Sequence, residues 1–100
     1  MLYFRCLVRG ENFPGELISK KGMVGFYTIR YVAIENPEDV ETVVVDMLRS
    51  DPRLIPTGDV YVGYSLARVY VEELTEIDVD EFRSNMNITP GFSWFSMNEV

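Results

Sequence analysis

Three stretches of the chain combine apolar and polar positions in ways that predict β-strands. Residues 2–9 place apolar side chains at every even position, and residues 66–77 alternate again, which predicts two strands with one buried face each. Residues 24–35 are rich in β-branched and aromatic side chains on both faces, which predicts a central strand covered in part on both sides. The expected core-facing positions of the two alternating stretches are Leu2, Phe4, Cys6, Val8, Ala67, Val69 and Val71.

A helical period follows the central strand. Apolar residues recur at the i, i+3, i+4, i+7 and i+8 positions of one stripe. These residues are Val40, Val43, Val44, Met47 and Leu48. Asn36 suits the N-cap and Pro37 the first helical position, while Pro52 predicts that the helix ends near residues 50–51. A short helical turn is expected within residues 78–86.

Turn-forming residues separate these elements. Gly, Asn and Pro are dense in residues 10–15, where we expect a turn. Leu17 and Ile18 then predict a short pairing segment, and residues 20–22 a hairpin tip. Residues 52–65 contain two Pro and two Gly and predict a long connection with a short strand near residues 60–62.

The chain is expected to close with one more strand. Residues 91–97 contain three aromatic rings, and neighbouring side chains of a strand alternate between faces. At least one ring must therefore point away from Trp94, while the others close the core. Phe13 is likewise expected to cap one end of the core.

The predicted order of elements is β-β-α-β-β in a single domain spanning residues 1–100. One main helix against an antiparallel sheet of about four strands is a two-layer α+β sandwich. The 47 % apolar and 25 % charged content is that of an ordinary globular protein. One cysteine permits no disulfide within the chain.

The net charge of −7 bears on the choice of partner. Residues 1–34 hold five basic and two acidic side chains, and residues 35–100 hold four basic and fourteen acidic ones. Nucleic acids and anionic membranes are disfavoured, because binding them relies on clustered Lys and Arg. No apolar run approaches the roughly 18 residues of a membrane span, and residues 1–9 are too short and charged for a signal segment. A cytoplasmic protein is expected.

No catalytic, metal-binding or cofactor-binding residues are predicted. The chain lacks histidine, which excludes Ser-His-Asp and Cys-His catalysis and leaves no ligand set for structural zinc. No glycine pattern precedes the helix as a phosphate loop requires. The carboxylates of residues 78–81 indicate a solvated acidic turn rather than a calcium loop. Cys6 shares a face with Phe4 and Val8, which predicts a buried, inert thiol.

One helix cannot cover both faces of the sheet, so the second face is the candidate site. Its expected members, apart from Leu7, are Tyr3, Arg5, Arg9, Arg30, Arg68, Tyr70 and Glu72. Interleaved Tyr and Arg could form a protein or self-association interface, a solvated face with Arg–Glu pairs, or a ligand surface that includes RNA. The acidic charge and the missing aromatic RNA-binding pattern weigh against RNA.

The sequence therefore favours a non-enzymatic interaction module. Its expected partner is a protein or a second copy of the chain as a homodimer, and an inhibitor-like or immunity-like role is one version. The alternative is a small ligand-binding domain, or a metal-free and histidine-free enzyme, with a pocket between the sheet and residues 52–65.

Overall fold

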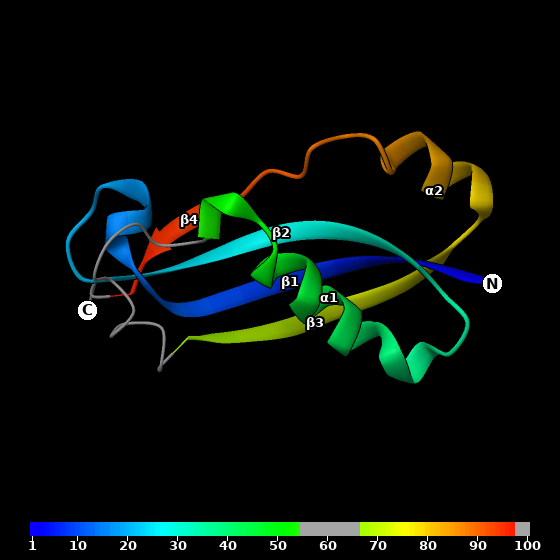
Figure 1. Cartoon of the computed structure of the whole chain (residues 1–100), viewed down its shortest axis with the longest axis horizontal. Helices are drawn as coiled ribbons and strands as arrows, with labels where there is room; N and C mark the ends of the chain where they lie inside the picture. The colour runs from blue at the N-terminus through cyan, green and yellow to red at the C-terminus, as the bar shows by residue number, and fades with distance from the viewer. Residues whose placement is uncertain (55–66, 98–100) are drawn as a thin grey trace.

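The computed structural model describes residues 1–54 and 67–97. Four strands form one antiparallel sheet in the order β3-β1-β2-β4 (Figure 1). The strands are β1 (Leu2–Pro14), β2 (Met23–Ile34), β3 (Arg68–Ile77) and β4 (Ser93–Ser96). The helices are α1 (Val40–Arg49) and α2 (Val79–Asn85), and 3₁₀ turns span Gly15–Ile18, Pro37–Asp39 and Pro52–Leu54. The predicted fold class, a four-stranded antiparallel sheet with one main helix, is confirmed.

The long β1–β2 hairpin is the centre of the sheet. Its register pairs Leu2 with Ile34 and runs without a break to Gly10 and Phe26, so the alternation of β1 decides which face each side chain takes. Phe4, Cys6 and Val8 are buried on one face, as the alternation predicted. Two residues of β1 oppose one residue of β2 between Gly10 and Phe13, and a second irregularity lies where Leu7 and Val8 pair with β3.

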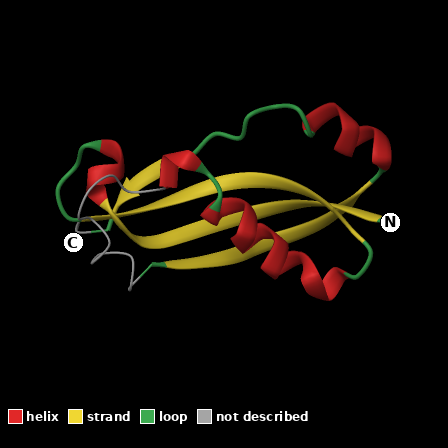
Figure 2. Cartoon of the chain, in the orientation of Figure 1, coloured by secondary structure: helices red, strands yellow, loops and turns green. Residues whose placement is uncertain are grey.

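Helix α1 packs on the face that carries the core (Figure 2). Val40, Val44 and Leu48 are buried, and they belong to the predicted apolar stripe. Asn36 caps the 3₁₀ turn before the helix and not α1 itself, since its Oδ1 accepts a hydrogen bond of 3.1 Å from the backbone N–H of Glu38. The Pro37–Asp39 segment is a 3₁₀ turn that leads into α1.

An aromatic cluster closes one end of the core. The ring of Phe26 lies 5.0 Å from those of Phe13 and Phe92, and 5.3 Å from that of Trp94. Phe95 points to the other face, where its ring lies 5.6 Å from that of Tyr27. The expectation that one ring of this segment points away is confirmed, and Phe13 is buried as expected.

The β1–β2 connection differs from the prediction. The Leu17–Ile18 pair belongs to the 3₁₀ turn Gly15–Ile18 and not to a strand. Gly15 N–H donates to the carbonyl of Gly22, and Ser19 and Gly22 have φ of 58° and 77°, so the chain reverses tightly before a further strand pair can form. The predicted strand near residues 60–62 lies outside the described residues. In the part of the chain that the structure describes, no helix has the length and apolar character to span a membrane.

Candidate interaction surface on the open face of the sheet

The sheet face opposite α1 is built from the odd-numbered side chains of β1 and β2. Residues paired across antiparallel strands share a face, so three rows can be read from the register. Tyr70, Arg9 and Tyr27 form one row; Glu73, Leu7 and Ile29 the next; and Thr75, Arg5 and Tyr31 the third. We call these nine residues, together with Glu72, the open face.

Arg9 is the centre of the charged part of the open face. Its Nε lies 2.9 Å from Oε1 of Glu72 and 3.2 Å from Oε1 of Glu11, although neither contact has hydrogen-bond geometry. The guanidinium carbon of Arg9 also lies 4.9 Å from the ring centre of Tyr70. These side chains are only partly exposed, so water screens the two ion pairs less than it would screen fully exposed pairs. The pairs therefore help to fix the conformations of Arg9, Glu11 and Glu72.

Large apolar side chains stand exposed beside this network. Tyr27, Ile29 and Tyr70 expose 39, 45 and 40 % of their surface, and Leu7 lies half-buried between Ile29 and Glu73. Contiguous exposed apolar surface on a folded chain commonly marks a binding site.

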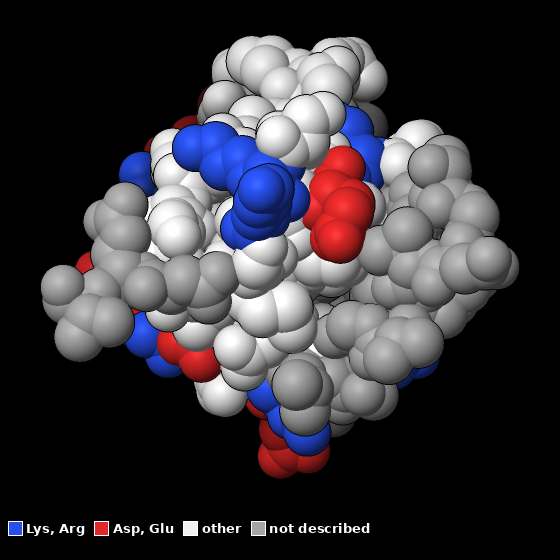
Figure 3. Space-filling model, turned by 90° about the vertical axis from the view of Figure 1, so that its left-hand side faces the viewer, with Lys and Arg blue, Asp and Glu red and all other residues white. Residues whose placement is uncertain are grey.

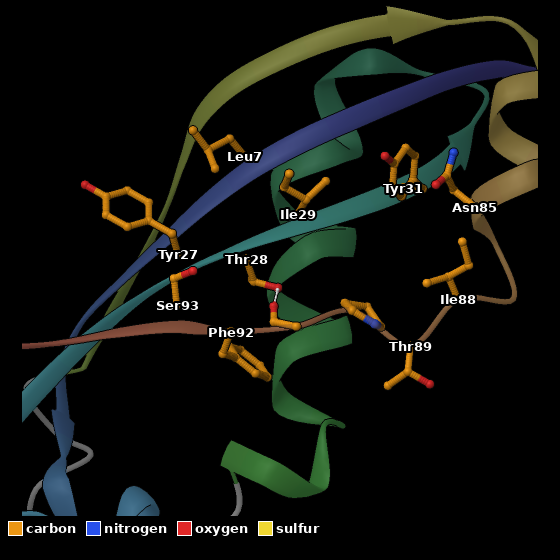
Figure 4. Close-up of a pocket in the computed structure, with 12 residues that line it drawn as sticks. Leu7, Tyr27, Thr28, Ile29, Tyr31, Asn85, Ile88, Thr89, Phe92 and Ser93 are labelled. Atoms are coloured by element: carbon orange, nitrogen blue, oxygen red, sulfur yellow. Dashed lines mark hydrogen bonds between the residues drawn. The ribbon is translucent and has the colours of Figure 1, made fainter.

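Helix α2 and the segment that follows it border the open face. The ring of Phe82 in α2 lies 5.0 Å from that of Tyr3, so α2 covers the end of the face where β1 begins. Residues 88–93 run beside β2, and a hollow of ≈430 Å³ lies between them and the sheet. Figure 4 shows Leu7, Tyr27, Ile29 and Tyr31 on the sheet side of this hollow, with Ile88 and Thr89 opposite.

Arg30 does not belong to the open face, and its predicted placement there is wrong. It is only 5 % exposed on the α1 side, where Nη2 donates to Oδ2 of Asp51 at 3.1 Å. Position 30 has the strand parity of Phe26 and Thr28, which face the core. The prediction grouped Arg30 with Arg5 and Arg9 because all three are basic. The alternation of side chains along the strand, however, decides which face Arg30 occupies.

Asp51 holds two arginines together beneath α1. Arg53 donates to both carboxylate oxygens, at 3.0 Å from Nε and 2.7 Å from Nη2. Hydrogen bonds from Arg53, with a smaller contribution from Arg30, hold the pKa of Asp51 well below its usual range. Arg53 Nη1 also donates to the carbonyl of Pro90, and its guanidinium lies 4.4 Å from the ring centre of Phe92. The cluster ties the end of α1 to the segment that borders the hollow.

The remaining predicted residues divide into two groups. Arg5, Arg9, Tyr70 and Glu72 lie together on the open face. Tyr3 is on the same side of the sheet but is partly covered by α2, while Arg68 pairs with Glu11 at the start of β3, also on that side, at the end of the face.

Sequence reasoning missed Tyr27 and Ile29 as members of the site. Both lie in the stretch expected to be covered in part on both sides. The signal that finds them is the hairpin register, since Tyr27 and Ile29 pair with Arg9 and Leu7.

The thiol of Cys6 and the acidic turn at residues 78–81 were the other groups considered for reactivity or metal binding. Cys6 is fully buried, and burial raises the pKa of its thiol to about 11. Asp78 Oδ1 accepts a hydrogen bond from the backbone N–H of Glu81 at 2.8 Å, so the acidic turn caps α2. Among the described residues, no group of three or more Cys, Asp or Glu side chains is placed to hold a metal ion.

Charge of both signs is present at the end of the molecule where β1 and β2 are joined. Basic side chains there gather beside an acidic group, and much of the described surface in this view is uncharged (Figure 3). A nucleic-acid-binding face would instead present a basic stripe.

Compared with protein-family models, curated proteins and solved structures, the chain has no significant match.

Proposed function

We propose that this protein is a non-enzymatic interaction module that binds protein through the open face, with a second copy of the chain as its first partner. The observation that carries the proposal is the group of exposed side chains Tyr27, Ile29 and Tyr70, from two neighbouring rows of the face that α1 leaves uncovered. Tyr is enriched at protein interfaces because its ring supplies apolar area and its hydroxyl a hydrogen bond.

The charges of the open face support self-association. Arg9 is already balanced by Glu11 and Glu72. Arg5 and Glu73 have no ion pair among the described residues, so the face presents both a basic and an acidic group to a partner. In a two-fold dimer the same patch meets itself, and a patch that carries both signs can complement its own copy.

Sedimentation velocity tests this proposal over protein concentrations from about 10 µM to about 1 mM. We expect the wild-type chain to dimerise in this range. The double variant Tyr27→Ser/Tyr70→Ser removes two exposed rings from the open face and should weaken the dimer at least about tenfold, since aromatic anchors carry much of an interface's affinity.

Leu74→Ser is the matched control. Leu74 is 46 % exposed but pairs with Cys6, so it stands on the other side of the sheet. Its loss should leave the dimer intact. A chain that stays monomeric at the highest concentration, or that loses the dimer equally in both variants, would contradict self-association through the open face.

The alternative of a ligand pocket between the sheet and residues 52–65 falls mostly outside the described residues. The hollow beside the open face is lined mainly by apolar and hydroxyl-bearing side chains. Its titratable members, Tyr27 and Tyr31, offer hydrogen-bonding groups but no carboxylate or amine for acid–base chemistry.

A further inference from the structure

The outer edge of β2 is only partly occupied by β4. Strand β4 pairs with residues Val24–Tyr27, while β2 continues to Ile34. The backbone N–H of Met97 donates to the carbonyl of Met23 at 3.0 Å, so the backbone groups of Met23 point to the β4 side. In a regular antiparallel strand this direction alternates along the chain. The backbone groups of Ile29, Tyr31 and Ala33 therefore point to the same edge.

Among the described residues, β1 pairs with this part of β2 on its inner side, and no strand pairs with its outer edge. The extra residue of the nearby irregularity belongs to β1, so the alternation within β2 is unbroken. The stretch from residue 29 to residue 33 is about 13 Å long at the usual rise of a strand. It offers a row of peptide donors and acceptors of the kind that templates an added strand.

A slot runs along this edge. The hollow beside the open face lies on one side of it, and a second hollow of ≈570 Å³ lies on the α1 side. Ile88, Thr89 and Pro90 line both hollows, so the two hollows adjoin this segment on opposite sides of the sheet and together make a space beside the β2 edge. We call this space the edge slot. Thr28 closes one end, because its Oγ1 donates to the carbonyl of Gly91 at 2.7 Å.

The two sides of the edge slot differ in chemistry. Toward the open face the sheet contributes the side chains of Tyr27, Ile29 and Tyr31. Toward α1 the slot meets Arg30 and Arg53, which share the single carboxylate of Asp51. That side carries one positive charge in excess within a chain whose net charge is −7.

Arg30 carries part of the positive charge on the α1 side of the slot. It is 5 % exposed, and its Nε has no hydrogen-bond acceptor among the described residues. A buried donor without an acceptor is costly and uncommon in folded proteins. An acidic side chain entering the α1 side of the slot would supply the missing negative charge.

We propose that the edge slot binds an extended peptide segment of a partner as an added strand. Its alternate side chains are apolar toward Tyr27, Ile29 and Tyr31 and acidic toward Arg30 and Arg53. This mode is β-strand addition, in which backbone hydrogen bonds supply affinity and alternate side chains supply specificity. A single extended chain fits better than the edge of a second sheet, because Ile88–Pro90 closes the far side of the slot. The inference goes beyond self-association, since it concerns the backbone edge and a different partner.

NMR titration and amide exchange with short peptides test the inference. The probe is a capped seven-residue peptide of alternating Val and Glu, and its comparison is the same peptide with Lys in place of Glu. We expect the Val/Glu peptide to shift and protect the Ile29 and Tyr31 amides, and to bind at least about tenfold more tightly than the Val/Lys peptide. The overall charge of the protein favours the Lys peptide, so a preference for Glu must arise locally.

Two matched comparisons isolate the backbone contribution. Ile29→Pro removes an N–H that faces the slot and not β1, which a strand edge tolerates, whereas Ile29→Ala removes the side chain and keeps the N–H. Binding should be lost in Ile29→Pro and only weakened in Ile29→Ala, which loses one apolar contact but keeps the backbone hydrogen bond. A Val/Glu peptide N-methylated on its backbone makes the same test without altering the protein, and it should not bind.

The inference is overturned if the Val/Glu peptide leaves the Ile29 and Tyr31 amides unchanged. It is also overturned if the N-methylated peptide binds equally well, or if amide protection rises with protein concentration alone, because the occupant would then be a second copy. Either of the first two results can occur while the dimer still depends on Tyr27 and Tyr70. Failure of this inference is therefore separable from failure of the proposed function.

Discussion

At the scale of single residues, Asp51 is the side chain whose surroundings constrain it most. It accepts hydrogen bonds from two guanidinium groups while being only 8 % exposed. A buried ion pair is weak evidence of net stabilisation, but removing one partner leaves the other charge buried alone. Arg30, which is itself buried, depends on Asp51 for its only ion pair among the described residues.

Asp51→Asn should lower the free energy of unfolding by about 3 kcal/mol. The neutral amide cannot balance Arg30 and Arg53, and Arg30 cannot reach solvent without disturbing the core. Urea denaturation measures this difference, and Asp46→Asn on the exposed side of α1 is the matched control, with an expected change within about 0.5 kcal/mol. Equal effects in the two variants would show that Arg30 does not rely on Asp51.

The same pair of variants has a defined pH dependence. Because the native pKa of Asp51 lies below its usual value, the unfolded chain binds this proton first as the pH falls. The stabilisation is therefore complete above about pH 4 and is lost as the pH drops toward the native pKa. The stability gap between the wild type and Asp51→Asn should shrink below about pH 4, and a gap that widens there would contradict this assignment.

At the scale of elements, the strands and α1 could be predicted because each has one dominant period. Phe4, Cys6 and Val8 of β1 are buried as expected, and Asn36 and Pro37 begin the 3₁₀ turn that leads into the helix. Arg30 could not be placed by its charge, because its face depends on strand parity and on a carboxylate beyond α1. The edge slot could not be predicted either, because it arises where β4 is shorter than β2 and the residues before β4 bend away.

Two glycines of the central strands lie under aromatic rings: Gly10 under Phe26 and Gly25 under Phe95. A Cβ at Gly25 would lie 2.3 Å from the ring of Phe95 and 2.7 Å from the carbonyl oxygen of Gly10, while a Cβ at Gly91 would meet no atom within 4 Å. Phe95 thus covers a strand position that has no side chain, as cross-strand aromatic rings do in other sheets.

Gly25→Ala should therefore destabilise the protein by about 1–3 kcal/mol, the usual range for overpacking. The added methyl group must displace both Phe95 and the backbone of β1. Thermal unfolding followed by circular dichroism measures the loss, with Gly91→Ala as the control that should change little. If the two substitutions had the same effect, the close approach of Phe95 to Gly25 would not describe the folded protein.

At the scale of the whole molecule, the open face exists because residues 1–54 and 67–97 form one long helix for two sheet faces. Helix α2 covers only the end near Tyr3, and residues 88–93 border the β2 side without covering it. The result is an elongated body, 41 × 24 × 20 Å, with one face packed and the other available. The sequence predicted this asymmetry from its number of helices, but not that Tyr27 and Ile29 stand exposed on the open face.

Net charge predicts how the proposed dimer responds to salt. Each copy carries −7, so two copies repel one another over distances of the Debye length, which is about 30 Å at 0.01 M salt and about 10 Å at 0.1 M. The attraction between open faces is mainly apolar and is little affected by screening. Raising NaCl from about 0.02 M to about 0.3 M should therefore strengthen the dimer several-fold in sedimentation velocity, with Tyr27→Ser/Tyr70→Ser remaining the weaker associator at both concentrations. An association that weakened tenfold with salt would instead place its energy in ion pairs such as those available to Arg5 and Glu73, and would contradict an interface built on the exposed rings.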